Sequence, residues 1–331
     1  MRSFVTIIAV AGFIGALTAG RGFALSVDAQ GNATNNIGRL SDIAARPLQH
    51  VIPPQPILVV QPVPPLNTHD VKFEKILTAE GAIAVDHTTD AILYEKNAHV
   101  ARPLASITKL MSALIISDHI QNWNATTTIA ADEVEEGNQA LSAGEVYTVK
   151  DLYSAALVGS LNTAVSALVG ATGLTRDQFV AAMNQRAKDL GMEQMSFVEP
   201  TGLSPADVGT PADVARLLKF ALSNPRIKVT SMTDHVSILE LKSHKRKNVN
   251  ATDWLLTEHV AMASAHIEGG KTGYIPEAGY NFAAQIKNDE GHEIRVVVLG
   301  TSDVYKRFTE TADIAEWIFG NFEWVEAKEK H

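Results

Sequence analysis

A serine and a lysine three residues apart form the first pattern in the sequence that could carry out chemistry. Residues 103–111 read PLASITKLM and include Ser106 and Lys109. On a helix, side chains at this spacing share a face and can touch. A serine hydroxyl becomes a nucleophile when a base takes its proton, and lysine is that base only in its neutral form. The pair fits an activated serine, but taken alone it is most simply interpreted as an ordinary surface pair.

A second polar cluster interrupts an apolar stretch of the sequence. Ser160 and Asn162 flank Leu161 between the segments ALVG and TAVSALVG. Polar side chains inside a protein need hydrogen-bond partners. Taken alone, the two residues are most simply interpreted as a cap at a break between two helices.

A third cluster combines a cation, a hydroxyl group and glycines. Lys271, Thr272 and Gly273 follow Gly269 and Gly270. Glycine in a strand permits close approach of the backbone to a ligand, and a lysine beside a threonine hydroxyl suits a carboxylate. Taken alone, the segment is also typical of a turn before a strand.

Composition and charge narrow the class of protein. The chain of 331 residues is 46% hydrophobic and 20% charged, which is typical of a globular protein with a sizeable core. Its net charge is −9 and its one short basic run is HKRK at 244–247, which disfavours nucleic-acid binding. It contains no cysteine, which excludes disulfides, thiolate catalysis and cysteine metal sites.

The first 24 residues have the three parts of an export signal. Arg2 is the positive start, residues 4–19 form an apolar run, and Gly22 and Ala24 suit the small positions before a cleavage site. The run falls short of the roughly 20 residues that span a bilayer. We expect residues 1–24 to be a cleaved signal peptide of a periplasmic or other extracytoplasmic envelope protein. The alternative is an uncleaved anchor, the one case in which we expect membrane attachment.

Residues 25–72 are predicted to be a flexible linker. The first half is polar, and PPQPILVVQPVPP then places six prolines within 13 residues. Such a segment has few backbone donors and favours extended polyproline II over a packed element. It is either a spacer or a tail without a specific role.

The catalytic domain is predicted to cover residues 73–325, with a short tail at 326–331. Residues 82–86 and 91–96 flank HTTD and predict a β-hairpin, and NFAAQIK and EIRVVVLG flank NDEGH and predict a second one. Between the hairpins, apolar residues at helical spacing follow Ser106, and residues 148–173 read as two buried helical pieces. A final helix is predicted over VYKRFTETADIAEWIF.

Two further helices carry clear start and stop signals. Thr175 is the expected N-cap of one and Gly191 its stop, while Thr210 caps the other, with Pro211 at its first helical position. The order of strands, helices, strands and helix predicts that both ends of the domain share one antiparallel sheet.

The order of the three polar clusters changes their interpretation. S-x-x-K, S-x-N and K-T-G, in this order and spacing, form the three-part pattern of penicillin-interactive serine enzymes. From about residue 76 to 320 the chain resembles the D-alanyl-D-alanine peptidases, the low-molecular-mass penicillin-binding proteins. The blocks that carry the resemblance are YEKNAHVARPLASITKLMSAL, AKDLGMEQMSFVEPTGLSPADVGTPADVARLL and GGKTGYIPEAGYNFAA. The resemblance implies an α+β fold of the DD-peptidase/β-lactamase type. In that fold, helices flank an antiparallel sheet, and the active site lies in the cleft beside an all-helical lobe.

The resemblance also implies a mechanism. Ser106 would attack the carbonyl of a D-Ala-D-Ala bond and form an acyl-enzyme, with Lys109 as the base. Ser160 would relay the proton to the leaving amine, and Asn162 would hold the substrate's amide.

Four consecutive residues would bind the rest of the substrate. Lys271 and Thr272 of the Lys271-Thr272-Gly273 strand would bind its carboxylate, and Lys271 would help to keep Lys109 neutral. The oxyanion would lie between the backbone N–H groups of Ser106 and Tyr274. No cofactor or metal is implied. The implied partners are the stem peptides of peptidoglycan, with β-lactams as covalent inhibitors and roles in the cell wall and in cell shape.

Two departures from the family pattern bear on specificity. Leu161 stands where small or polar residues are common, and we expect it to narrow the cleft near Asn162. The chain ends at His331 without the C-terminal β-domain of many family members. This shorter plan, together with the segment FVEPTGLS, resembles the branch of endopeptidases that cleave crosslinks. We expect a D-Ala-D-Ala carboxypeptidase, with an endopeptidase as the alternative.

Two less favoured functions remain open. A β-lactamase uses the same motifs with a glutamate that positions water, and Glu199 lies 37 residues past Asn162. The TGLS that follows Glu199 and Pro200 matches the peptidases instead. A catalytically inactive peptidoglycan-binding module is the second alternative, and the intact reactive positions argue against it.

Overall fold

The structure, a computed structural model, describes residues 26–27, 33–34, 62–68, 70–135, 140–257 and 259–325. The chain divides into two units, Met1–Val59 and Val60–His331. In the first, β1 (Ser26–Val27) pairs antiparallel with β2 (Ala33–Thr34). The predicted signal peptide and most of the predicted linker lie outside the described residues. Within the described part of the chain, no helix has both the length and the hydropathy to cross a bilayer.

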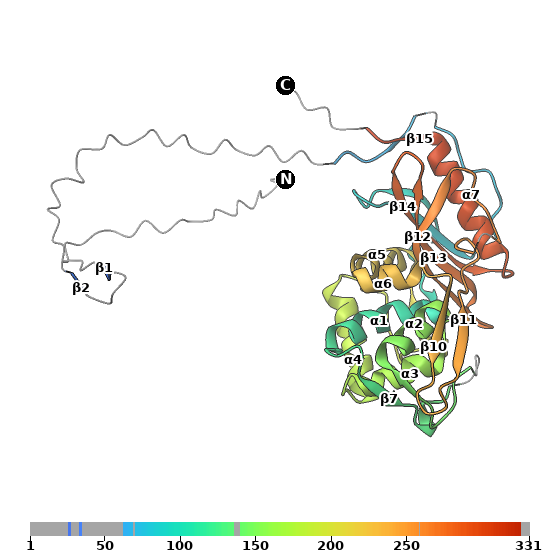
Figure 1. Cartoon of the computed structure of the whole chain (residues 1–331). Coiled ribbons are helices and arrows are strands. Elements are labelled where there is room, and N and C mark those ends of the chain that lie inside the picture. The colour runs from blue at the N-terminus through green and yellow to red at the C-terminus, as the bar shows by residue number, and fades with distance from the viewer. Residues whose placement is uncertain are drawn as a thin grey trace. The chain divides into compact units, whose positions relative to one another are not determined.

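A five-stranded antiparallel sheet forms the centre of the second unit (Figure 1). Its strand order is β12-β13-β14-β4-β5, so strands from the two ends of the domain pair directly, as predicted. The strands are β4 (Gly81–Asp86), β5 (Ile92–Lys96), β12 (Ala265–Ile275), β13 (Gly279–Asn288) and β14 (Glu293–Thr301). Both predicted hairpins, β4–β5 and β13–β14, are present.

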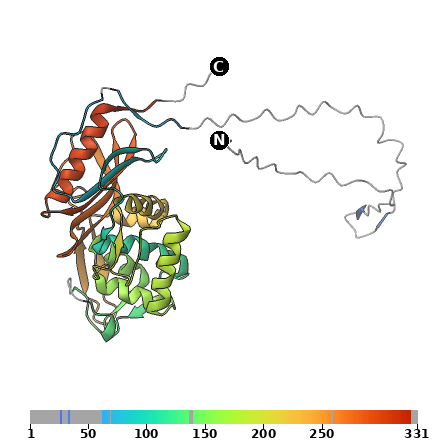
Figure 2. The same cartoon turned by 180° about the vertical axis from the view of Figure 1, so that it is seen from behind.

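The two faces of the sheet belong to different cores. Side chains alternate along a strand, and in β4 Ile83 and Val85 pack with the helical lobe while Ala82 and Ala84 pack with α7 (Lys306–Asn321). Figures 1 and 2 show α7 on one side of the sheet and the helices on the other. This double burial explains why the central strands read as nearly continuous apolar runs.

Six helices form the lobe on the other side of the sheet (Figure 2). They are α1 (Thr108–His119), α2 (Val149–Val158), α3 (Asn162–Ala171), α4 (Arg176–Asp189), α5 (Pro211–Ser223) and α6 (Pro225–Ser231). The buried pair predicted over residues 148–173 is α2 and α3, with the break at Ser160 and Leu161. This arrangement confirms the predicted α+β fold.

The predicted caps define the two helices that carry them. Thr175 Oγ1 accepts the N–H of Gln178 at 3.2 Å at the start of α4, and Gly191 follows its end with a φ of 70°. Thr210 Oγ1 accepts the N–H of Asp213 at 3.0 Å, and Pro211 begins α5. Both helices therefore begin where the sequence indicated.

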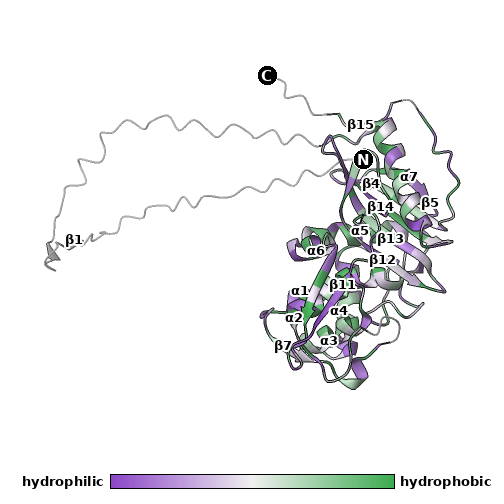
Figure 3. Cartoon of the chain, turned by 45° about the vertical axis from the view of Figure 1, so that its right-hand side comes forward, coloured by the Kyte–Doolittle hydropathy of each residue, from purple (hydrophilic) through white to green (hydrophobic). Residues whose placement is uncertain are grey.

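The short strands were not predicted from the sequence. A hairpin of β10 (His235–Leu239) and β11 (Arg246–Asn250) runs beside the helical lobe, and Figure 3 shows hydrophilic residues on it. The remaining pairs are β3 (Leu66–Asn67) with β15 (Phe322–Glu323), β6 (Arg102–Pro103) with β9 (Val208–Gly209), and β7 (Thr126–Thr128) with β8 (Val146–Thr148). Since β3 belongs to the segment predicted as linker, ordered pairing begins before the predicted boundary at residue 73.

Candidate active site

Ser106 lies in a tight turn just ahead of α1. The sequence predicted it in the first turn of that helix, but α1 begins at Thr108, and Ser106 belongs to a 3₁₀ turn, Ala105–Ile107. Ala105 has a φ of 48°, a left-handed conformation that is uncommon for residues other than glycine. Such conformations cluster at functional sites, where the surrounding structure holds them in place.

A buried asparagine on the sheet holds this turn. Asn281 of β13 is fully buried, and its Nδ2 donates to the carbonyl oxygens of Pro103 and Leu104, each at 3.0 Å. Its Oδ1 accepts the N–H of Gly300 on β14 at 2.8 Å. Because buried carbonyl groups need donors, Asn281 fixes the chain just before Ser106 to two central strands.

Two glycines pack against the same turn. Gly202 has a φ of 86°, and a Cβ there would lie 1.9 Å from the carbonyl oxygen of Ala105. A Cβ on Gly273 would lie 2.9 Å from the carbonyl oxygen of Leu104 and 3.0 Å from the N of Ser106. The glycine of the K-T-G motif therefore allows close approach to the nucleophile turn itself.

Lys109 lies beneath Ser106 and is almost fully buried, with 1% of its surface exposed. Its Nζ lies 2.8 Å from Ser106 Oγ, 2.6 Å from Asn162 Oδ1 and 2.6 Å from the carbonyl oxygen of Thr201. The structure thus brings together three residues that the motifs singled out, with Thr201 as an addition that the sequence did not indicate.

These contacts match a neutral amine. The oxygens of Asn162 and Thr201 only accept hydrogen bonds, so each takes one N–H of Lys109. The hydroxyl of Ser106 can donate, and it then directs its proton at the remaining lone pair of Nζ. Burial lowers the pKa of Lys109 to about 7, against the opposing influence of Glu199, Asp207 and Glu135. Near neutral pH, a large share of the molecules therefore carries an amine able to accept a proton.

The second and third motifs meet at another lysine. Lys271 Nζ lies 2.9 Å from Ser160 Oγ and 2.9 Å from the carbonyl oxygen of Thr272. Ser160 has a φ of 59°, which turns the break between α2 and α3 toward β12. Thr272 Oγ1 lies 2.5 Å from Thr252 Oγ1, a partner that the sequence did not indicate.

Burial and two neighbouring cations lower the pKa of Lys271. The pKa of Lys271 is held well below its usual range by burial, then by the charges of Lys109 and Arg307, with Asp253 opposing them. Its exposed fraction is 2%. The structure therefore places the buried amino group of Lys271 on Ser160.

Arg307 on α7 supplies a cation that sequence reasoning missed. Its Nη1 donates to the carbonyl oxygen of Gly273 at 3.3 Å, and its guanidinium lies 5.6 Å from the centre of the Tyr280 ring. Tyr280 stacks on Tyr274 at 4.3 Å between ring centres, and Tyr274 is exposed. Burial raises the pKa of the neighbouring Asp253 to about 6. No motif marks Arg307, which reaches the site from another helix.

Leu161 does not narrow the site as we expected. It is fully buried and belongs to the core of the helical lobe. An apolar side chain between two polar ones turns inward because burial removes its surface from water. The departure of Leu161 from the family pattern is therefore a matter of packing.

Glu199 organises the loop that presents Thr201 to Lys109. Its carboxylate accepts hydrogen bonds from the N–H and Oγ1 of Thr201, each at 2.7 Å, from the N–H of Leu203 at 2.7 Å, and from the N–H of Gly202. Burial alone would raise the pKa of Glu199, but these hydrogen bonds outweigh it and hold the pKa below the usual range. A carboxylate bound in this way is a poor water-activating base, which argues against the β-lactamase alternative.

Asp207 forms a carboxyl pair with Glu199. Its Oδ1 accepts the N–H of Val198 at 2.7 Å, and its Oδ2 is buried without an N–H or hydroxyl donor among the described residues. Burial raises the pKa of Asp207 to about 7; the N–H of Val198 opposes this effect, and the charge of Glu199 adds to it. Of the two carboxyl groups, Asp207 therefore holds a proton more readily than Glu199.

Replacing Asp207 by asparagine is expected to remove a loss of stability at high pH. Because the pKa of Asp207 is raised on folding, its contribution to stability is present at low pH and is lost as the pH rises through about 7. Asp207→Asn keeps the oxygen for Val198 and places an amide donor toward Glu199. Between pH 5.5 and 8.5 the variant should lose less unfolding free energy in urea than the wild type, by on the order of 1 kcal/mol. Equal losses of unfolding free energy in the two proteins would contradict a raised pKa of Asp207 in the folded protein.

The described residues contain no group of three or more His, Cys, Asp or Glu side chains placed to hold a metal ion. What the site does contain is a serine hydroxyl on a buried amine, a second hydroxyl on a second buried amine, and a nearby guanidinium. This arrangement defines a serine peptidase of the acyl-enzyme type. The sequence model of peptidase family S11, D-alanyl-D-alanine carboxypeptidase, matches residues 68–303, and the chain belongs to this family.

Curated relatives carry two different activities in their names. The chain is 29% identical over 249 residues to a D-alanyl-D-alanine endopeptidase of Pseudomonas aeruginosa, with 74% of this chain and 79% of the relative covered. It is 31% identical over 207 residues to one of Haemophilus influenzae, with 61% and 68% covered. A D-alanyl-D-alanine carboxypeptidase of Bacillus subtilis is 28% identical, with 74% and 63% covered.

Solved structures show the same fold. The Streptomyces K15 DD-transpeptidase aligns with a TM-score of 0.67 at 24% identity. The alignment covers 74% of this chain and 98% of that one. At this identity, the likeness concerns the fold alone.

Proposed function

We propose that the protein hydrolyses D-alanyl peptide bonds in peptidoglycan through an acyl-enzyme on Ser106. The observation that carries this proposal is the environment of Lys109, whose amine has two obligate acceptors and one remaining position, directed at Ser106 Oγ. Relatives with D-alanyl-D-alanine peptidase names support the choice of substrate.

The proposed acylation begins at Ser106. Its oxygen attacks the substrate carbonyl while its proton passes to Lys109, and a tetrahedral intermediate forms. The carbonyl oxygen, now negative, accepts hydrogen bonds from the N–H groups of Ser106 and Tyr274, each worth about 3 kcal/mol. The C–N bond then breaks, and Ser160, held by Lys271, passes its proton to the leaving amine and takes over the proton that Lys109 received, so that Lys109 is neutral again. Water releases the acyl group by the reverse sequence of proton transfers.

The rest of the substrate is assigned to three neighbouring groups. Asn162 is assigned to the substrate's amide, in addition to its hydrogen bond with Lys109. The hydroxyl of Thr272 receives the carboxylate next to the leaving amine, and the positive charges of Lys271 and Arg307 lie behind the strand. Burial disfavours the charge on both groups, and the negative charge of a bound carboxylate would oppose that effect.

Crosslink cleavage is our leading assignment, which revises the expectation from the sequence. A crosslink and a free D-Ala-D-Ala end both present an amine next to a carboxylate, so the site can accept either leaving group. The relatives at 29% and 31% identity are named endopeptidases, and this favours the crosslink. The carboxypeptidase reaction is the second candidate, supported by the family description and by the relative at 28% identity.

The two reactions are separated by their products. We expect the purified protein to convert crosslinked muropeptide dimers into monomers, measured by mass spectrometry. Loss of a terminal D-alanine from monomeric pentapeptides at an equal or higher rate would favour the carboxypeptidase. Absence of both products, with a Ser106→Ala protein as the background control, would refute the proposed function.

We also propose that the protein works outside the cytoplasm and reacts with β-lactams. The export pattern over residues 1–24 supports the location, where peptidoglycan is found. A β-lactam presents a strained amide beside a carboxylate, so it fits the same nucleophile and the same cations. Roles in wall maintenance and cell shape follow from this substrate.

A further inference from the structure

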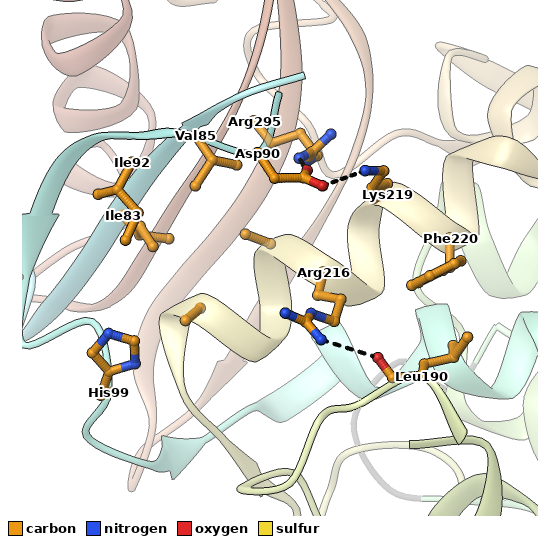
Figure 4. Close-up of a pocket in the computed structure, with 12 residues that line it drawn as sticks. Ile83, Val85, Asp90, Ile92, His99, Leu190, Arg216, Lys219, Phe220 and Arg295 are labelled. Carbon is orange, nitrogen blue, oxygen red and sulfur yellow. Dashed lines mark hydrogen bonds and ion pairs between the residues drawn. The ribbon is translucent and has the colours of Figure 1, made fainter. Parts of the chain in front are cut away.

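A second pocket lies at the other edge of the sheet from the K-T-G strand. β12 and β5 are the two outer strands of the sheet, and a hollow of about 450 Å³ is formed where β4 and β5 face α5 (Figure 4). The two sites are therefore separated by the width of the sheet. A ligand can occupy this pocket while Ser106 is engaged.

The pocket concentrates positive charge. Arg216 and Lys219 on α5 and Arg295 on β14 line it, together with one carboxylate, Asp90. Three cations and one anion leave a charge of +2 (3 − 1) in a chain whose net charge is −9. Asp90 binds both Arg295 and Lys219, as Figure 4 shows, so one carboxylate serves two cations.

The charged base of the pocket is rigidly built. The side chain of Arg295 is 1% exposed, and its Nη1 donates to the carbonyl oxygen of His87 at 3.2 Å. Burying a guanidinium is costly unless it is paired, and its ion pair with Asp90 fixes that carboxylate. Burial works against ionisation of Asp90, but Lys219 and Arg295 outweigh it and lower the pKa. Asp90 therefore stays charged and holds Lys219 at the pocket wall.

Arg216 is the lining cation that forms no ion pair among the described residues, although its charge acts on Asp213, one turn earlier on α5. It is exposed, and among the described residues its Nη1 reaches only the carbonyl oxygens of Leu190 at 3.4 Å and Gly191 at 3.2 Å. A Cβ on Gly191 would lie 2.7 Å from this nitrogen, so the glycine makes room for the guanidinium. The planar donor fork of arginine suits a carboxylate, and here it borders the hollow.

Apolar side chains also line the hollow. Ile92 on β5 is 51% exposed, and Phe220 and Leu190 are at the other end of the hollow (Figure 4). Exposed apolar surface within a pocket favours a ligand that brings a hydrocarbon part. Arg216 forms no ion pair among the described residues, and Lys219 shares the carboxylate of Asp90 with Arg295. The pocket therefore combines these two cations with room for short alkyl groups.

We propose that this cationic pocket, defined by Arg216, Lys219, Arg295, Ile92 and Phe220, binds a short peptide that carries carboxylates. One carboxylate lies on Arg216 and Lys219, and an alkyl side chain lies on Ile92 or Phe220. The inference deepens the proposed function, because peptidoglycan stems are short peptides with several carboxylates and methyl groups. The pocket then holds a neighbouring stem while Ser106 cuts another, which anchors the enzyme on its polymeric substrate.

The binding test uses a probe that the proposed active site cannot cleave. The tripeptide L-Ala-γ-D-Glu-meso-diaminopimelate contains the carboxylates but no D-alanyl bond, and it is titrated calorimetrically into the full chain. We expect saturable binding that weakens at least about tenfold in Arg216→Gln, which breaks no ion pair, and further in Arg216→Gln/Lys219→Gln. Lys188 is an exposed residue of α4 outside the pocket, and Lys188→Gln makes the same change of charge. This control variant should bind the tripeptide within about twofold of the wild-type affinity.

The outcomes separate this proposal from the proposed function. Absence of saturable binding, or equal weakening in Lys188→Gln, would overturn the pocket. Inorganic phosphate is titrated in parallel, and if it binds as tightly as the tripeptide, the site is a general oxyanion site and the peptide assignment is wrong. Both pocket variants should cleave a small soluble substrate at the wild-type rate and polymeric peptidoglycan several-fold more slowly. Tripeptide binding by a protein that cleaves no D-alanyl bond would refute the catalytic proposal and leave the pocket in place.

Discussion

Replacing Ser106 by alanine is expected to abolish covalent labelling by a fluorescent penicillin and to lower peptide hydrolysis by about 10³-fold or more. The hydroxyl is the atom that forms the acyl bond, and it is the group at which the amine of Lys109 is directed across 2.8 Å. Since Ser106 is half-buried in a turn held by other residues, the variant should unfold in urea within about 1 kcal/mol of the wild type.

A second serine, on the helix that follows the nucleophile turn, provides the matched control. Ser112 is fully buried, and its Oγ donates to the carbonyl oxygen of Pro200 at 2.5 Å, so Ser112→Ala also removes a hydroxyl that contacts the Glu199 loop. That variant should lose about 1 kcal/mol of stability and keep its labelling. Labelling of Ser106→Ala, or equal losses of activity in the two variants, would assign the nucleophile elsewhere.

Replacing Lys109 by methionine is expected to slow acylation by about 10³-fold, within the range for a lost general base. Methionine is nearly as long and is uncharged, so it fills the buried position while removing the proton acceptor. Stopped-flow acylation by a chromogenic β-lactam measures the step directly. A loss smaller than about tenfold would show that another group takes the proton from Ser106.

The same variant tests the pH dependence of the base. Burial lowers the pKa of Lys109 from 10.5 to about 7, so the reactive neutral fraction grows as the pH rises and levels off above about 8. In the wild type, the acylation rate should therefore increase about tenfold for each pH unit below the pKa. In Lys109→Met this slope should disappear. A wild-type profile that falls between pH 6 and 8 would show that the lysine acts in its protonated form, and a variant that keeps the slope would assign it to another group.

Local patterns in the sequence were sufficient for most of the fold. The apolar run of β4 and the turn residues of β13–β14 depend on neighbours in the chain, and Thr175 and Thr210 each accept an N–H three residues later at the start of a helix. The closing of both ends into one sheet could also be predicted, because strands at the two ends must cover their edges. The three motifs were predicted from residue types and order, and the structure does bring their side chains together.

Other parts of the site depend on contacts that no local pattern encodes. Asn281 and Arg307 reach the site from a strand and a helix far along the chain, and nothing beside them distinguishes them from ordinary polar residues. Ser106 was placed in a helix because its apolar neighbours have helical spacing, whereas the close packing of Gly202 and Gly273 requires a tighter turn there. Leu161 was assigned to the cleft by comparison with the family, although its inward direction depends on the packing of α2 and α3.

The hydrogen bonds of Asn281 have a consequence for the order of folding. The nucleophile turn at 105–107 is synthesised long before β13 and β14, yet the two carbonyl groups just before it are held by Asn281, which in turn accepts the N–H of Gly300. Contacts this distant in sequence form late, because closing a long loop costs entropy before any contact forms. A chain that lacks its last strands therefore has the serine and the lysine but no fixed geometry between them. The catalytic pair reaches its working geometry only when the last strands of the sheet are in place.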